Sequence, residues 1–307
     1  MRYQFDIFDL SLVSFIAEGH SFTYAAERGC ISLPAVSNRV RNLEEGMGVK
    51  LFHRTRSGVK LTEAGDKLLK RASNILRELE NLRDDMKEYA GGTKGSLRIW
   101  GTTTAVSEFL PSIVGNFLQS HNDIRIDLSE AKGDDIVSAI REGTVDIGII
   151  SNTAYSEGLE VVPYRTLRLV LVTGMAHELA HRSSVRFTET LAFDYVGLPD
   201  SSAYQHFLED TFSSLNKQLK LRVRASNFEA VSRMAELNIG IALLPESVAL
   251  RHAEAMDIKI IPLADAWAVR KLQICVRHRE ALPLFARELM DILLADANEL
   301  VSNKAES

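Results

Sequence analysis

The sequence predicts an α/β protein in three consecutive parts: a small helical unit that ends in a hairpin, one long helix, and a larger region of alternating strands and helices. Three observations support this division. Two helical patterns meet at a tight turn over residues 29–31, a proline-free helical pattern runs from Thr62 to about Ala90, and strand and helix patterns alternate from Ser96 onward. A chain of 307 residues also exceeds one small core, so two or more domains are expected.

The first part contains a helix-turn-helix pattern between Ser21 and Leu43, preceded by a supporting helix that begins near Ile7. Ser32 is placed to cap the last helix, and Pro34 lies in its first turn, where a missing N–H costs nothing. The inward-facing apolar stripe consists of Val36, Val40 and Leu43. In a helix-turn-helix the last helix lies in the major groove of DNA, although an ordinary helical hairpin with a solvated face fits this stretch equally well.

A β-hairpin is predicted directly after these helices, with strands at 49–55 and 59–62. A hairpin in this position is a wing. From Cys30 to Lys60 there are six basic side chains and two acidic ones, a local charge of +4 in a chain whose formal net charge is -5. This asymmetry favours DNA contact over a solvated basic loop. The side chains expected to contact DNA are Ser32, Leu33, Pro34, Ser37, Asn38, Arg41, Arg54 and Arg56.

The second part is a long helix that Thr62 can cap and that Gly91-Gly92 ends. Its apolar positions are spaced alternately by four and three residues, as in a coiled coil. These positions are Leu68, Ala72, Ile75, Leu79, Leu82, Met86 and Tyr89. A heptad stripe behind a DNA-binding unit predicts a dimerisation arm, and docking on the chain's own body is the alternative.

The third part alternates strand and helix patterns over about 210 residues. The strands are expected at 97–101, 124–128, 145–150, 167–173, 195–198, 221–225, 239–244, 258–262 and 271–276, with helices that include 107–119, 134–142, 204–217 and 228–237. This alternation predicts largely parallel sheets with helices on their faces, arranged as two lobes with a cleft between them. Ligands in such folds bind beyond the carboxyl ends of strands.

Taken end to end, the chain resembles the LysR-type transcriptional regulators. The resemblance rests on the A-A pair, the S-x-P-A-V-S core, the L-E-x-x-x-G-x-x-L-F-x-R run and the L-T-x-A-G that opens the long helix. It implies a winged helix-turn-helix at 1–61, a dimerising linker helix at 62–92 and an effector domain at 93–307 that resembles periplasmic binding proteins. Lobe I would span about 93–162 and 266–307, and lobe II about 163–265.

The resemblance also implies a homotetramer that grips and bends promoter DNA in response to a small molecule, and contact with RNA polymerase if the protein is an activator. Two residues depart from the family pattern. Leu33 stands where a polar residue, commonly Gln, is usual, so an apolar contact to a thymine methyl is the available substitute. Gly29 replaces a large apolar residue before the turn.

Mapped residue by residue, the family's ligand cleft falls on several loops of the third part. The implied effector-binding residues are Thr102, Thr103, Thr104, Ser151, Asn152, Ser201, Ser202, Tyr204 and Phe228, with Tyr155 as a further aromatic neighbour. Hydroxyls and backbone N–H groups at strand and helix ends suit a carboxylate, so an organic acid or an aromatic compound is expected. A constitutive regulator whose α/β domain only oligomerises is the alternative.

Other function classes lack their motifs. No G-x-S-x-G elbow, H-E-x-x-H helix, Walker loop or dinucleotide fingerprint follows a strand, so neither catalysis nor a cofactor is expected. His177 and His181 resemble an i, i+4 pair on a surface helix, without further metal ligands. Cys30 and Cys275 are expected to be reduced and buried. With neither a signal peptide nor a membrane-spanning run, the sequence predicts a cytoplasmic protein that does not contact membranes.

Overall fold

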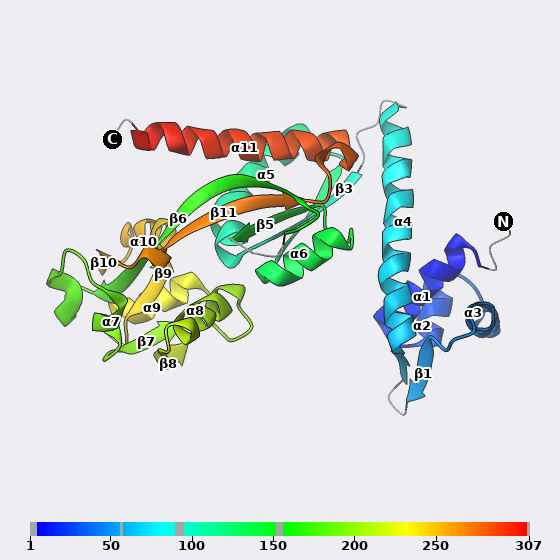
Figure 1. Ribbon diagram of the computed structural model, residues 1–307, viewed down its shortest axis with the longest axis horizontal. Coiled ribbons are helices and arrows are strands. Elements are labelled where there is room, and N and C mark those ends of the chain that lie inside the picture. The colour runs from blue at the N-terminus through cyan, green and yellow to red at the C-terminus, as the bar shows by residue number, and fades with distance from the viewer. Residues whose placement is uncertain (1–4, 56–57, 90–94, 152–155, 306–307) are drawn as a thin grey trace. The chain divides into compact units, whose positions relative to one another are not determined.

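The computed structural model describes residues 5–55, 58–89, 95–151 and 156–305. Its chain forms two compact units, the first made of residues 1–95 with 142–144, and the second made of residues 96–141 and 145–307 (Figure 1). The first unit contains α1 (Ile7–Gly19), α2 (Phe22–Arg28), α3 (Leu33–Met47), β1 (Phe52–Thr55), β2 (Gly58–Leu61) and α4 (Glu63–Tyr89).

The helices of the first unit begin where their capping residues lie. Asp6 and Asp9 form a reciprocal capping box at α1, Ser21 caps α2, and the Ser32 hydroxyl accepts a hydrogen bond from the Ala35 N–H at the start of α3. Helix α3 ends at Gly48, whose left-handed backbone (φ +69°) suits glycine. Local hydrogen-bonding chemistry therefore sets the helix boundaries that the sequence indicated.

A compact apolar core joins α1, α2, α3 and the hairpin. Its buried members are Leu12, Val13, Ile16, Ala25, Ala26, Val36, Val40, Leu43, Leu51, Phe52 and Val59. The hairpin strands β1 and β2 pair antiparallel, from Phe52 with Leu61 to Thr55 with Gly58. Gly58 has φ +127°, and a Cβ there would lie 2.7 Å from the His20 carbonyl oxygen, so this end of the hairpin requires glycine.

The second unit contains two lobes built on one seven-stranded sheet and a separate two-stranded sheet. Lobe I holds β3 (Gly95–Gly101), η1 (Ala105–Phe109), α5 (Leu110–Ser120), β4 (Ile124–Glu130), α6 (Gly133–Arg141), β5 (Ile147–Ser151), η4 (Arg279–Ala281) and α11 (Leu284–Ala305). Lobe II holds η2 (Glu178–His181), α7 (Phe187–Thr190), β7 (Asp194–Gly197), α8 (Ala203–Ser214), β8 (Lys220–Arg224), α9 (Phe228–Glu236), β9 (Ala242–Pro245), α10 (Glu246–Ala253), β10 (Ile258–Pro262) and η3 (Ala266–Ala268).

Two strands cross between the lobes, β6 (Glu160–Gly174) and β11 (Val269–Val276), and Figure 1 shows them running side by side. The first half of β6 pairs with β11, and its second half pairs with β10 and β9. The strand order in the large sheet is β10-β6-β11-β5-β3-β4, with β9 also on β6. These crossing strands connect the lobes covalently at two points.

The expectation of largely parallel sheets is wrong for the large sheet, which is mixed. Strand β3 pairs parallel with β5, whereas β11 is antiparallel to β5 and β6, and β6 is antiparallel to β9 and β10. The two crossing strands cause the difference because they return the chain in opposite directions across both lobes. Residues 160–166, which the sequence pattern did not assign to a strand, form the first half of β6.

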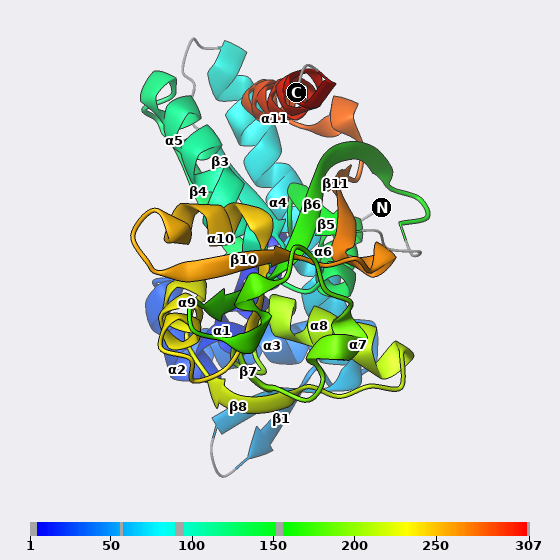
Figure 2. The same cartoon turned by 90° about the vertical axis from the view of Figure 1, so that its left-hand side faces the viewer.

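Each lobe has its own apolar core. In lobe I, one cluster lies under α5 and α11 and another under α6, on the opposite face of the sheet (Figures 1 and 2). Lobe II has a single cluster that joins α8, α9 and α10 to its strands. Cys275 lies in the α6 cluster, as expected, and burial raises the pKa of its thiol to about 11.

Two local expectations are corrected. Cys30 is exposed, because it occupies the turn between α2 and α3 with a left-handed backbone (φ +52°) that directs the chain into α3. His177 and His181 do not form an i, i+4 pair on an α-helix. His177 precedes the short 3-10 helix η2, its ring nitrogen accepts a hydrogen bond from the Leu179 N–H, and its ring packs edge-on against Phe193.

Candidate DNA-binding surface and interlobe cleft

The outer face of α3 is accessible and mostly polar, with Leu33 and Pro34 as its apolar residues. Leu33, Pro34, Asn38 and Arg41 are exposed and Ser37 is partly buried, while Ser32 caps the helix. Leu33 is 43% exposed, which places an apolar group on the surface beside polar ones. The stripe of Val36, Val40 and Leu43 is buried as the sequence predicted.

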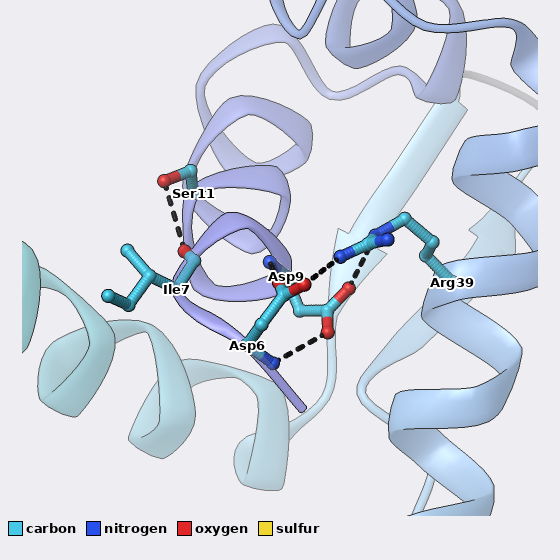
Figure 3. Close-up of polar contacts among 5 residues, drawn as sticks. All are labelled: Asp6, Ile7, Asp9, Ser11 and Arg39. Atoms are coloured by element: carbon cyan, nitrogen blue, oxygen red, sulfur yellow. Dashed lines mark hydrogen bonds and ion pairs between the residues drawn. The ribbon is translucent and has the colours of Figure 1, made fainter. Parts of the chain in front are cut away.

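Arg39 lies on α3 but is committed to its own domain. Its Nη2 binds the Asp6 carboxylate at 2.5 Å and its Nε binds Asp9 at 2.7 Å, tying α3 to the start of α1 (Figure 3). The hydrogen bond from Arg39 is the largest influence that holds the pKa of Asp6 below its usual value. The local charge of +4 therefore overstates the positive charge available to DNA. It counts Arg39 but not the two acidic partners of Arg39, which lie about 30 residues earlier in the sequence, outside the counted stretch.

Arg41 is better placed for a ligand outside the chain. Its side chain is 63% exposed, donates a hydrogen bond to Asn38 Oδ1, and lies 3.9 Å from the Glu45 carboxylate. Exposed ion pairs of this kind are weak, on the order of 0.5 kcal/mol, so the guanidinium can turn toward a base or phosphate at little cost. Asn38 and Arg41 therefore form an exposed pair of hydrogen-bonding groups on α3.

Glu44 connects the end of α3 to the hairpin. It is buried, and its carboxylate accepts hydrogen bonds from the Leu51 N–H at 2.8 Å and the Phe52 N–H at 3.4 Å, and from Lys50 Nζ at 2.6 Å. Burial, the largest single influence, raises the pKa of Glu44, but these donors together outweigh it and hold the pKa below its usual value. The sequence analysis counted Glu44 only as a negative charge and missed this role.

The predicted basic wing is described in part. Arg54 belongs to β1, Lys60 on β2 is exposed, and Arg56 lies outside the described residues. Lys50, which contributed to the basic count, is paired with Glu44. Lys60 is thus the basic side chain of the hairpin that is described as accessible.

The heptad stripe on α4 divides into two portions. Leu68 packs against the core of the first unit and Ala72 is fully buried. Farther along, Leu79 is partly buried, whereas Ile75, Leu82 and Met86 are 46%, 53% and 54% exposed. Tyr89 is the last residue of the helix. The internal-docking alternative thus describes the first portion, and the second portion carries large apolar groups on the surface.

A cleft in the second unit collects the carboxyl ends of three lobe I strands. Thr102 follows β3, Ala131 follows β4, and Ser151 ends β5. Together with the start of α8 from lobe II they enclose a cavity of about 180 Å³. Its lining residues are Thr102, Thr103, Thr104, Ala131, Lys132, Gly133, Asp134, Ser151, Ala203, Tyr204, His206, Phe207, Asp210 and Arg270.

Arg270 is the most distinctive side chain of this cavity. It lies on β11, donates a hydrogen bond to the Ser151 hydroxyl, and places its guanidinium over the Phe207 ring, 3.4 Å from the ring centre. Burial lowers the pKa of Arg270 to about 10, so it stays charged at neutral pH. Among the described residues no carboxylate forms an ion pair with it, and the Thr102 hydroxyl, also buried, has no hydrogen-bond partner there.

One acidic side chain joins Thr103, in the loop after β3, to the start of α8. Glu130, the last residue of β4, accepts hydrogen bonds at Oε1 from Thr103 Oγ1 (2.7 Å), Ser202 Oγ (3.3 Å) and the Ala203 N–H (2.9 Å). The Tyr204 N–H donates to Thr103 Oγ1 at 3.0 Å. A further polar contact between the lobes joins Arg251 to Glu108 at 2.6 Å.

The expected effector residues separate into three groups. Thr102, Thr103, Thr104, Ser151 and Tyr204 line the cavity. Ser202 caps α8 beside it, Ser201 is exposed, and Phe228 belongs to the lobe II core, edge-on against Tyr204. Asn152 and Tyr155 lie outside the described residues.

Sequence reasoning missed several charged residues of the cleft: Glu130, Lys132, Asp134, His206 and Arg270. Glu130 and Lys132 could have been found, since they directly follow a predicted strand end. Arg270 gave no such signal, because its position depends on where the crossing strand β11 begins. In the part of the chain that the structure describes, no group of three acidic, histidine or cysteine side chains could hold a metal ion, and no helix is long and apolar enough to span a membrane.

A winged helix-turn-helix and a two-lobed α/β domain on one chain are the parts of a transcriptional regulator with a ligand-binding domain. Two family profiles match the sequence, "Bacterial regulatory helix-turn-helix protein, lysR family" at residues 8–66 and "LysR substrate binding domain" at residues 90–298. The chain therefore belongs to the LysR family of transcriptional regulators. The matching relatives are regulators rather than enzymes.

Individual relatives are distant, and two of the three described next cover most of the chain. The "Probable RuBisCO transcriptional regulator" of Emiliania huxleyi is 26% identical over 303 residues, covering 95% of this chain and 96% of that protein. Full-length CbnR in complex with its target DNA is similar with a TM-score of 0.67 and 20% identity, over 94% of this chain and 98% of that one. The effector-binding domain of QuiR in complex with shikimate is similar with a TM-score of 0.54 and 20% identity, over 67% of this chain and 98% of that one.

Proposed function

We propose that this regulator binds promoter DNA sequence-specifically through α3, assembles as a dimer of dimers, and responds to a small organic anion in the interlobe cleft. The observation that carries the effector part is the partly buried Arg270, which lines the cavity and has no carboxylate partner among the described residues. Binding to chromosomal DNA places this activity in the cytoplasm, with RNA polymerase as a further partner if the protein activates transcription.

Three features support DNA reading by α3. The helix carries exposed polar side chains near its N-terminal end, its apolar stripe is buried, and the neighbouring helices and hairpin fix its position. Asn38 and Arg41 can make paired hydrogen bonds to base edges in the major groove. CbnR, which has a similar fold, was solved on its target DNA.

Self-association is supported by the surface of α4. Ile75, Leu82 and Met86 recur on one helical stripe and are each about half exposed in the single chain. Large apolar groups repeated in this way favour a partner surface over solvent. Two paired α3 helices would then read an inverted repeat, and pairing of two such dimers gives the proposed tetramer.

The effector class follows from cavity size and charge. A cavity of about 180 Å³ is smaller than the roughly 300–1,000 Å³ typical of drug-sized ligands, so the effector should be compact. Arg270 and Lys132 supply positive charge and Asp134 and Asp210 negative charge, so the preference for an anion rests on Arg270, which has no ion-pair partner among the described residues. Thr102 adds an unsatisfied hydroxyl and Phe207 an aromatic wall. QuiR was solved with shikimate, a compact acid, in a domain of the same fold.

A ligand screen tests the effector part. Small carboxylates, both aliphatic and aromatic, are added to the full chain while its melting temperature is followed. A ligand that binds only the folded state increases the free energy of unfolding, by roughly 2.7 kcal/mol at a ligand concentration of 100 Kd, and so raises the melting temperature. We expect a hit whose shift disappears in Arg270→Gln and persists in Lys271→Gln, a change at the exposed neighbouring residue.

The constitutive alternative predicts a different outcome. If no small anion shifts the melting temperature, or if Arg270→Gln and Lys271→Gln respond alike, the cleft does not bind an anionic effector. DNA binding measured on the same preparations shows whether the DNA-binding role survives in that case. A hit must also change the affinity or the footprint on DNA for the regulatory role to stand.

A further inference from the structure

One carboxylate connects the two lobes at the place where an effector anion was expected. Glu130 belongs to lobe I, and two of the groups that donate to its Oε1, the Ser202 hydroxyl and the Ala203 N–H, belong to the start of α8 in lobe II. The third donor, Thr103 Oγ1, comes from the loop after β3. Hydroxyl and amide groups that could hold a ligand's acid group are therefore engaged by an acid group of the chain itself.

The positions of these groups explain why a carboxylate is stable there. Helix α8 has 12 residues, and its first N–H groups carry the positive end of the helix dipole. Glu130 supplies the negative charge that such an end favours, while Ser202 caps the Tyr204 N–H at 3.2 Å. Thr103, Ala203 and Tyr204 also line the cavity, so this carboxylate position adjoins the space that contains Arg270.

The Glu130 contact is nevertheless easy to exchange. Glu130 itself is exposed, and its bonds to Thr103, Ser202 and Ala203 lie at the surface, where the net strength of a hydrogen bond is small because water competes for both partners. The lobes have other links, namely the crossing strands β6 and β11, the hydrogen bond from the Tyr204 N–H to Thr103 Oγ1, and the pair between Arg251 and Glu108. Loss of the Glu130 contact can thus loosen the cleft without unfolding either lobe.

We infer that Glu130 is an internal competitor of the effector: it occupies the anion position at the start of α8, holds the lobes together, and is displaced when the acid group of an effector binds there. This rests on the proposed effector cleft and adds its regulation. When the effector binds, its acid group replaces the Glu130 carboxylate at the start of α8. Unlike Glu130, the effector is not attached to lobe I. The exchange gives the ligand a direct influence on how the lobes are held.

Chemical rescue tests this inference without knowledge of the effector. Glu130→Ala leaves a gap the size of a carboxylate, and acetate is the probe that can fill it. We follow hydrogen exchange of the Ala203 amide, the backbone group that donates to Glu130, in the full chain, in acetate and in chloride at equal pH and ionic strength. In chloride, exchange should be about tenfold faster in the variant than in the wild type, and acetate should slow it again in the variant alone.

Asp134→Ala is the matched control, because Asp134 is another cavity carboxylate but has no hydrogen bond to α8 among the described contacts. This variant should exchange like the wild type at the Ala203 amide and should not respond to acetate. An equal acetate response in all three proteins, or unchanged exchange in Glu130→Ala, overturns the inference.

The test separates this inference from the proposed function. Acetate rescue requires neither DNA nor the natural effector, so failed rescue in a protein that still responds to a cleft ligand overturns the role of Glu130 alone. Successful rescue combined with a screen in which no carboxylate binds the wild type overturns the proposed effector cleft, and with it the displacement of Glu130 by an effector, but leaves the contact between Glu130 and α8 in place. The affinity of any hit for Glu130→Ala should exceed its affinity for the wild type by about tenfold, and a lower affinity contradicts competition.

Discussion

Single charged residues fix the geometry of the DNA-binding unit. Arg39 joins α3 to α1 through Asp6 and Asp9, and Glu44 joins the end of α3 to the hairpin backbone. A count of charges along the sequence gives these residues the same weight as Arg41, yet the structure assigns them different roles. Arg39 and Lys50 are engaged within the chain, while Arg41 remains accessible.

The role of Glu44 leads to a prediction about stability and pH. Glu44→Gln should lower the free energy of unfolding at pH 7 by about 1–3 kcal/mol, because the amide replaces a carboxylate that accepts charged and backbone donors in a buried place. Denaturant titration of the full chain measures it. Glu45→Gln, at the exposed next residue, should change little.

The sign of the pH dependence follows from the lowered pKa. Because the folded state holds the pKa of Glu44 below its unfolded value, the stabilisation is fully present above about pH 4.5 and is lost as the pH falls through the folded pKa. The difference in unfolding free energy between wild type and Glu44→Gln should therefore narrow below about pH 4.5. A difference that stays constant down to pH 3 contradicts this role.

At the scale of elements, the sequence predicted those whose signals are local. The Ser32 cap, Pro34 and the apolar stripe identified α3, and two short strand patterns identified the hairpin. The crossing strand β6 was assigned only in part, because its first half packs in one lobe and its second half in the other. Its 15 residues thus have no single burial pattern.

The cleft was predictable to the same degree. Thr102, Thr103, Thr104 and Ser151 were expected from the resemblance to the LysR family, and they follow predicted strand ends, where α/β sheets bind ligands. Arg270 was not predictable, because it reaches the cavity only through the pairing of β11 with β5 and β6. Cys30 was placed wrongly, since burial of the turn residues depends on the left-handed turn and not on their polarity.

The divided stripe on α4 leads to a prediction about assembly. Leu82→Glu should lower the mass of the particle in sedimentation velocity, because it places a charge among exposed apolar groups that would pack against a partner. The control is Arg83→Glu, which is exposed and lies about 100° around the helix. An unchanged particle in Leu82→Glu would show that the exposed portion of the stripe is not an interface.

At the scale of the whole molecule, the chain combines a helix-turn-helix unit with a cleft where, among the described residues, the cation Arg270 has no ion-pair partner and Glu130 contacts the start of α8. The family assignment establishes that such a protein regulates transcription. Sequence-specific reading by α3 is the claim on which the rest depends, because an effector can regulate promoters only if the protein finds them.

The most direct measurement is the affinity ratio between a duplex selected by this protein from a random pool and the same duplex scrambled, both at one salt concentration. The wild-type ratio should reach at least about 10³. Arg41→Ala should lower this ratio by a factor that corresponds to about 1–3 kcal/mol of binding free energy, and should relax the base preference at one position of each half-site. Arg54→Ala should weaken binding to both duplexes equally and lower the slope of affinity against salt concentration by about one. A wild-type ratio near one, or equal losses on both duplexes for Arg41→Ala, would contradict base reading by α3.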